Sequence, residues 1–178
     1  MSTRHQYYNQ ENLFFITTTT KDWINIFKID SCKKVIVDSL KFCITKYTVD
    51  ILAYVLMPNH IHMILYFKKD TKLSDFMRDF KKFTSRNIRL ELQKANYLDI
   101  LKLLEFQKGE QTYKVWQDRY DAKIIKGNDM LLTKINYIHN NPVKNGLVQK
   151  VEDWTSSSAG FYNGMECELP IKNAGEIM

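Results

Sequence analysis

The chain has 178 residues, of which 44% are hydrophobic and 13% aromatic, as is typical of one globular domain and not of a disordered chain. No apolar run is long enough to span a membrane, and the first ten residues, MSTRHQYYNQ, lack the apolar core of a signal peptide. The three cysteines are widely spaced and outside any CxxC pattern, which argues against a disulfide framework or a zinc knuckle.

We therefore expect a cytoplasmic, single-domain protein over residues 1–178, with a tail from about residue 143. Its net charge of +6 is unevenly spread, because residues 68–94 carry nine Lys or Arg against four Asp or Glu. Such a stretch is typical of a surface that binds a polyanion, most often nucleic acid, and equally of a solvated helix face.

The N-terminal half predicts a strand, a helix and a hairpin. The β-branched and aromatic run LFFITTTT, residues 13–20, predicts a strand, and Asp30 or Ser31 is positioned to cap a helix that runs to about residue 47. DILAYVLM, residues 50–57, predicts a buried strand, and Pro58-Asn59 separates it from the next. A turn this short cannot hold a parallel crossover, so the two strands should pair antiparallel.

The C-terminal half alternates helical and extended patterns. A helix is predicted from Ser74, followed by a short helix and a loop around Gly109, and then by an extended segment over residues 113–125. A last helix should begin after Gly127 and stop near Asn141, because a following proline disfavours helical geometry. This order of elements predicts an α+β fold of ferredoxin-like type, a two-layer sandwich with an antiparallel sheet and helices on one face.

Residues that can carry chemistry lie in the stretch MPNHIHMIL and in the last helix. His60 and His62 stand two positions apart in a strand, so both imidazoles emerge on one face and make half of a metal site. Tyr137 and Asn141 are four residues apart on a helix and project together. Each also has a structural interpretation: a hydrogen-bonded histidine, a packed tyrosine, or a helix stop before proline. His139 lies about 200° around the helix from Tyr137 and is a poor partner for it.

The two motifs together, MPNHIHMIL and YIHNNPVKNGLV, resemble those of the HUH single-tyrosine nucleases, and within them the REP-associated tyrosine transposases. The resemblance spans about residues 7–162. It implies an HUH endonuclease type of fold, His60 and His62 as metal ligands, and Tyr137 as the nucleophile. It also implies that Asn141 is the third, amide-bearing ligand, with Asn140 as the alternative.

By this resemblance the chain would nick and rejoin single-stranded or hairpin DNA through a 5′-phosphotyrosine, with Mg²⁺ or Mn²⁺ as cofactor. It would act as a monomer or homodimer, with no membrane partner and no small-molecule substrate. A catalytically idle hairpin-binding protein and a metal-dependent hydrolase unrelated to nucleic acid are the alternatives. Either Trp116 or Tyr120 could stack on unpaired bases, although burial in the core is the favoured role for Trp116. The candidate phosphate contacts are Arg78, Lys81, Lys82, Arg86 and Arg89.

Overall fold

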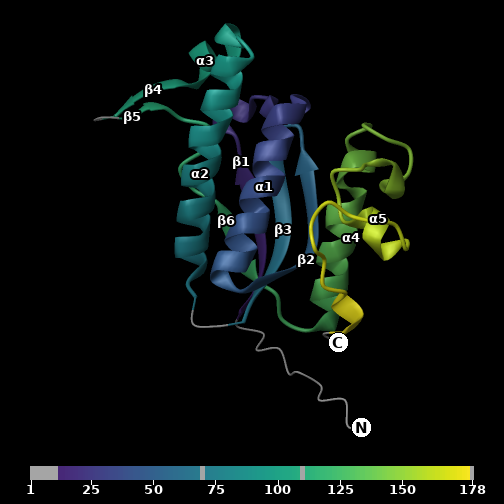
Figure 1. Ribbon diagram of the computed structural model, residues 1–178. Helices are drawn as coiled ribbons and strands as arrows, with labels where there is room; N and C mark the ends of the chain where they lie inside the picture. The colour runs from purple at the N-terminus through teal and green to yellow at the C-terminus, as the bar shows by residue number, and fades with distance from the viewer. Residues whose placement is uncertain (1–11, 69–70, 109–110, 177–178) are drawn as a thin grey trace.

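The computed structural model describes residues 12–68, 71–108 and 111–176 (Figure 1). Its centre is a four-stranded sheet of order β2-β3-β1-β6 in which every neighbouring pair is antiparallel. This is the strand order of a ferredoxin-like fold, so the predicted α+β class and antiparallel sheet are confirmed. The strands of this sheet are β1 (Leu13–Thr19), β2 (Val49–Met57), β3 (His60–Phe67) and β6 (Asp121–Ile124).

The helices and smaller elements follow the predicted order with additions. A second, two-stranded sheet, β4 with β5, stands beside the long helix α2 in Figure 1. The helices are α1 (Asp30–Tyr47), α2 (Leu73–Lys94), α3 (Leu98–Leu104), α4 (Asn128–Lys144) and α5 (Ala159–Tyr162). The remaining elements are β4 (Glu105–Lys108), β5 (Gln111–Tyr113), η2 (Lys21–Trp23), η3 (Ile26–Lys28), η4 (Val151–Asp153) and η5 (Ala174–Glu176).

Helices cover both faces of the main sheet, so the prediction that they cover one face only is wrong. One core contains Ile61 and Met63 of β3 packed against α1 and α2, and a second contains Ile64 of β3 packed against Ile135 and Ile138 of α4. The reason lies in β2, where residues of both parities are buried, as a strand covered on two sides requires. The site described below lies on the face that α4 covers.

Two further local predictions differ from the structure. The loop expected around Gly109 is a strand pair, β4 with β5, although Gly109 itself lies outside the described residues. Neither Asp30 nor Ser31 caps α1, because the helix already begins at Asp30 after Ile29 and has no side-chain hydrogen bond at its N-cap. The predicted extended segment contains β6 and an isolated bridge between Thr20 and Trp116.

The C-terminal tail packs along the outer edge of β2. The backbone N–H of Leu56 donates to Ser156 O at 2.8 Å, and that of Lys172 donates to Ile51 O at 2.8 Å. An edge strand with unpaired backbone groups invites pairing with another chain, and the tail occupies part of that edge here. Within the described ranges, no helix has both the length and the apolar character needed to cross a membrane.

Candidate active site

The antiparallel register of β1 against β3, together with helix α4, assembles the site. β1 pairs with β3 so that Thr17 lies opposite His62 and Thr19 opposite His60. The imidazole centroids of His60 and His62 are 4.7 Å apart, and the ring of Tyr137 on α4 stands 5.2 Å from that of His62. The structure therefore brings together the predicted histidine pair and the predicted tyrosine, which is 39% exposed.

Both imidazoles are held through Nδ1. The Nδ1 of His62 lies 2.8 Å from Thr17 Oγ1, and the Nδ1 of His60 lies 2.6 Å from the Oδ1 of Asn59. An amide oxygen can only accept, so His60 carries its proton on Nδ1 and presents the lone pair of Nε2. The threonine hydroxyl can accept in the same way, which would leave both Nε2 atoms as metal ligands oriented by a hydrogen-bonded neighbour.

Burial keeps the histidines neutral. Desolvation, with smaller contributions from the nearby His60 and Lys134, lowers the pKa of His62 to about 3. Desolvation also lowers the pKa of His60. The deprotonated imidazole is the form that binds a metal ion, so at neutral pH both rings are in that form.

A lysine that forms no ion pair with any described carboxylate lies next to the tyrosine. The Nζ of Lys134 is 4.6 Å from the ring centroid of Phe15 and 5.6 Å from that of Tyr137. The Nζ of Lys144 is 5.9 Å from the same tyrosine ring. No carboxylate among the described residues forms an ion pair with Lys134. The site is thus positively charged around a phenol, which suits an anionic ligand.

Helix α4 does not stop at Asn141, so that prediction is wrong. It continues through Pro142 to Lys144, because Asn145 closes its end: the backbone N–H and the Nδ2 of Asn145 both donate to Asn141 O, at 3.1 and 2.8 Å. Tyr137 and Asn141 therefore keep their helical spacing of one turn.

The position of Asn141 differs from that of the other predicted ligands. Its side chain is 6% exposed, and its Oδ1 accepts a hydrogen bond from Asn145 Nδ2 at 3.1 Å. No hydrogen bond joins it to either histidine in the part of the chain that the structure describes. The alternative ligand, Asn140, bonds through Nδ2 to the backbone O of Asn136 at 2.8 Å, within its own helix.

The donor set available near the histidines is limited. Across residues 12–68, 71–108 and 111–176, no three His, Cys, Asp or Glu side chains group closely enough to hold a metal ion. An ion at the histidine pair would therefore need an amide, a phosphate oxygen or water as its further ligands. His139 is not one of them, because its Nε2 lies 2.8 Å from Ser158 Oγ in the interior.

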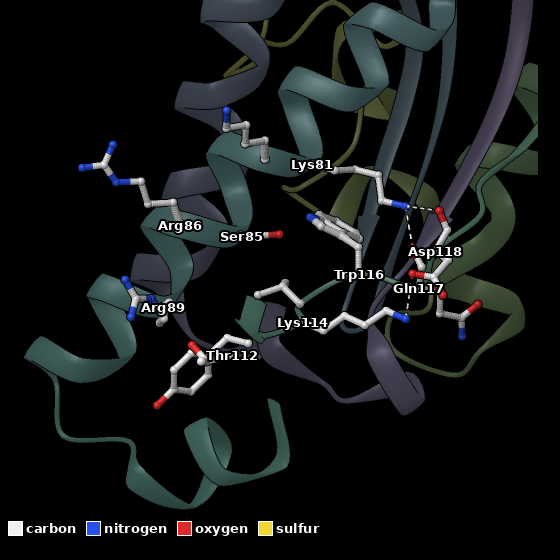
Figure 2. A pocket seen from close by; sticks show the side chains of 12 residues that line it. Lys81, Ser85, Arg86, Arg89, Thr112, Lys114, Trp116, Gln117 and Asp118 are labelled. Carbon is white, nitrogen blue, oxygen red and sulfur yellow. Dashed lines mark hydrogen bonds and ion pairs between the residues drawn. The ribbon is translucent and has the colours of Figure 1, made fainter. Parts of the chain in front are cut away.

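The predicted phosphate contacts divide into two groups. Lys82, Arg86 and Arg89 line a groove of about 520 Å³ between α2 and residues 112–118, where no described carboxylate forms an ion pair with them (Figure 2). The guanidinium of Arg89 stands over the ring of Tyr113 at 5.4 Å. One acid, Asp118, also lines the groove, and its carboxylate pairs with Lys114 at 2.8 Å.

The other two cations are engaged with the protein itself. Lys81 donates to the backbone oxygens of Gln117 and Asp118, at 2.5 and 3.2 Å, as the dashed lines in Figure 2 show. Arg78 forms ion pairs with Asp75 and Asp79 at 2.7 and 3.2 Å and lies outside the groove. Lys81 thus fastens the wall of the groove, and Arg78 is neutralised locally.

Of the two candidate stacking residues, Trp116 is a core residue. It is 3% exposed, its Nε1 donates to Thr84 Oγ1 at 2.8 Å, and it packs against Phe27 and Phe80. Tyr120 is partly buried and packs against the same core. Neither presents an open ring face comparable to that of an exposed aromatic.

Sequence reasoning missed the residues that support the site, namely Phe15, Thr17, Asn59 and Lys134. Phe15 stacks on His62 with centroids 5.6 Å apart, and with Thr17 it belongs to the α4 face of β1. The sequence held a weak signal for Phe15 and Thr17, because residues two apart on a strand share a face. Only the register of β1 against β3 tells which histidine they meet.

A ferredoxin-like sheet whose histidine pair faces a helical tyrosine defines a class of DNA-processing proteins, and the comparison with known families agrees. Residues 13–141 match the model of the family described as "Transposase IS200 like", and the chain belongs to this family. It is 24% identical over 173 residues to a protein of Haemophilus influenzae assigned as a REP-associated tyrosine transposase, covering 95% of this chain and 90% of that one.

A solved structure shares the fold over the whole chain. The REP-associated tyrosine transposase bound to a REP hairpin superimposes with a TM-score of 0.62 at 20% sequence identity. The match covers 100% of this chain and 94% of that chain. The fold is therefore that of a known tyrosine transposase.

Proposed function

We propose that the protein is a metal-dependent endonuclease and strand transferase that nicks and rejoins single-stranded DNA at repeat hairpins. One observation carries the proposal: folding places the ring of Tyr137 against His62, and His62 against His60, although α4 lies far from β3 in the sequence. Membership of the IS200-like transposase family supports it, and the similar solved enzyme is bound to a REP hairpin.

In the proposed reaction, Tyr137 is the nucleophile. Its phenol oxygen loses its proton to solvent and attacks the phosphorus of a phosphodiester, the bond from phosphorus to the 3′ oxygen breaks, and the 3′ oxygen takes up a proton from solvent. The products are a 5′-phosphotyrosine on the protein and a free 3′-hydroxyl on the other DNA fragment. The phosphotyrosine replaces one phosphodiester by another, so a 3′-hydroxyl can reverse the step without ATP.

The chain's residues fit a divalent ion at the histidine pair. His60 and His62 would hold it through Nε2, because their Nδ1 atoms are already bonded, and Asn141 would add an amide oxygen. Ligand preference allows Zn²⁺ or Mn²⁺ with imidazoles, whereas Mg²⁺ prefers oxygen, so of the two ions that the family resemblance implies Mn²⁺ suits the whole set and Mg²⁺ suits only its amide oxygen. A bound ion would neutralise charge on the scissile phosphate and stabilise the leaving oxygen.

The lysines beside Tyr137 would assist through charge. Lys134 approaches both Phe15 and Tyr137 and has no carboxylate partner among the described residues, so a phosphate oxygen or the forming phenolate can take that place. Preorganised positive charge where negative charge develops lowers the barrier, because it needs no rearrangement during the reaction.

The groove on α2 would hold the DNA backbone. Lys82, Arg86 and Arg89 line it, with no ion pair to a described carboxylate. The side of the groove formed by residues 112–118 is close to the histidines. The N–H of Gln117 donates to Thr19 O at 2.9 Å, and Thr19 lies opposite His60 in the pairing of β1 with β3. Neighbouring strands are about 4.8 Å apart, so the wall stands about two strand spacings from His60.

The test of the chemistry is a covalent adduct. An oligonucleotide carrying a palindromic repeat that flanks the gene is incubated with the protein and Mn²⁺, and the mixture is run on a denaturing gel. We expect a DNA-linked protein band that Tyr137→Phe abolishes while DNA binding stays intact. An adduct formed by the Phe variant would refute the role of Tyr137, and binding without an adduct under Mn²⁺ or Mg²⁺ would favour an idle hairpin-binding protein.

The test of the groove is the salt dependence of binding. Replacing Lys82, Arg86 and Arg89 by Gln should reduce the slope of log affinity against log salt by about 2, at roughly 0.7 per phosphate contact on a single strand. Arg78→Gln is the matched control, because it removes a charge from the same helix that is already paired with Asp75 and Asp79. An equal reduction of this slope in Arg78→Gln and in the triple variant would refute the role of the groove in DNA binding.

A further inference from the structure

Trp23 is an exposed aromatic side chain beside the histidine pair, and nothing in the proposed chemistry uses it. Its side chain is 59% exposed, and its ring lies 6.3 Å from that of His60 in an edge-on arrangement. The ring contacts thus run from Trp23 through His60 and His62 to Tyr137. An indole exposed to water at this end of the ring contacts gains nothing from burial, so packing does not account for its position.

The backbone that presents Trp23 is strained. Asp22 and Trp23 have φ values of 50° and 57°, the left-handed region that side chains other than glycine rarely occupy. Two successive residues in this region are held only where surrounding contacts impose them, and such strain concentrates at functional sites. A glycine would remove the strain, and the sequence has a tryptophan instead.

The contacts that hold this conformation come from Asn59, in the turn between β2 and β3. The Nδ2 of Asn59 donates to Trp23 O at 3.3 Å, while the Oδ1 of the same residue bonds to His60 Nδ1 at 2.6 Å. Thr20 adds a second link, because its N–H and its Oγ1 both donate to Asn59 O, at 2.9 and 3.0 Å. One asparagine therefore positions both the imidazole and the indole.

We infer that Trp23 is a base-stacking subsite, where an unpaired base next to the scissile phosphate lies on the indole. The inference rests on the proposed function, because it takes the histidine pair as the place of the phosphate. Every base has a π face, so stacking on an exposed indole binds single-stranded DNA with little sequence preference. In a duplex that face is covered by neighbouring base pairs, so the subsite selects an unpaired nucleotide.

Intrinsic fluorescence can observe this contact directly, with no metal and in the Tyr137→Phe background. Of the three tryptophans, Trp116 is buried, and Trp154 is partly buried against the second core, where its Nε1 donates to Leu56 O at 3.0 Å. Titration with a 15-residue oligothymidylate should quench the emission of Trp23. An abasic 15-mer, which has the same phosphates and no bases, should leave it unquenched.

Two substitutions separate stacking from structure. Trp23→Gly should weaken oligothymidylate binding about fivefold or more, as loss of one stacked base does, and it should leave abasic binding unchanged. Because glycine tolerates a positive φ, the melting temperature should stay the same or rise, whereas loss of a structural tryptophan would lower it. Phe42→Leu is the control, since Phe42 is 53% exposed on α1 beside Phe83, far from the histidines in the fold.

Three results would overturn the subsite: equal quenching by the two oligonucleotides, quenching that persists in Trp23→Gly, or unchanged affinity in that variant. Trp23→Phe keeps an aromatic face and should retain most of the affinity. These binding measurements do not depend on strand cleavage. An absent adduct with intact quenching would refute the nuclease and leave the subsite, and an adduct without quenching would do the reverse.

Discussion

The hydroxyl of Thr17 is the contact whose removal tests the metal site most cleanly. Thr17→Val keeps the shape and the strand preference of the residue, and deletes only the oxygen that lies 2.8 Å from His62 Nδ1. Without that partner His62 loses the hydrogen bond that fixes its tautomer and its ring orientation. Nε2 would then present its lone pair to a metal ion only part of the time.

Two magnitudes follow from this geometry. Loss of one hydrogen bond lowers the free energy of unfolding by about 1 kcal/mol, and removal of an outer contact to a metal-binding histidine weakens metal affinity by about 10- to 100-fold. The assay is the rate of adduct formation against Mn²⁺ concentration, together with thermal unfolding. We expect the half-saturating Mn²⁺ concentration to rise at least about tenfold, with the rate at saturating Mn²⁺ largely preserved.

Thr18→Val provides a control on the next residue of the same strand. Thr18 is 1% exposed, and its Oγ1 has no hydrogen-bond partner among the described residues. Removing a buried, unsatisfied hydroxyl should leave stability unchanged or raise it by about 1 kcal/mol, with no effect on Mn²⁺ dependence. If Thr17→Val needs no more Mn²⁺ than the wild-type protein, the orientation of His62 by Thr17 is refuted.

Three further outcomes are expected. Lys134→Met should slow adduct formation by about 10- to 100-fold with DNA affinity little changed, and Lys134→Arg should restore part of the rate; equal rates in all three proteins would contradict a role for this charge. Asn141→Ala should raise the Mn²⁺ requirement about tenfold, whereas Asn140→Ala should not, and the reverse result would make Asn140 the ligand. Burial lowers the pKa of His139 to about 4, below its usual value near 6.5, so protonation favours the unfolded chain and stability is lost as pH falls from 6.5 towards 4. Between pH 8 and 5 this histidine should lower the free energy of unfolding by about 2 kcal/mol. His139→Gln, which can still bond to Ser158, should lose correspondingly less stability over this range in urea unfolding. Equal pH dependence in the two proteins would contradict this origin.

The elements that the sequence predicted well are those with a clear hydrophobic period. β1, α1, the β2–β3 hairpin and α2 lie within one or two residues of their predicted bounds, because each is a continuous apolar run or a helical apolar stripe with a clear break at its end. The face covered by α4 was missed for a related reason. A strand buried on both sides, such as β2, has no alternation that would reveal a second layer.

Predictions from local sequence preferences failed where tertiary contacts override those preferences. Pro142 lacks the N–H that would continue the helix, yet α4 extends past it, because Pro142 is buried and Asn145 and Leu147 supply bonds to Asn141 O and Pro142 O. The histidine pair and the tyrosine were predictable from motifs. Their supporting residues were not, since the contact of Thr17 with His62 depends on a cross-strand register that no single segment encodes.

The central claim is that Tyr137 joins the 5′ phosphate of a cleaved strand, and end-labelled DNA tests it most directly. The hairpin oligonucleotide is labelled at its 3′ end in one sample and at its 5′ end in another, and each is incubated with the protein and Mn²⁺. We expect the protein band to carry the 3′-end label, the 5′-end label to appear on a shorter free fragment, and Tyr137→Phe to give neither product. A protein band that carries the 5′-end label, or a labelled band that persists in Tyr137→Phe, would contradict the proposed mechanism.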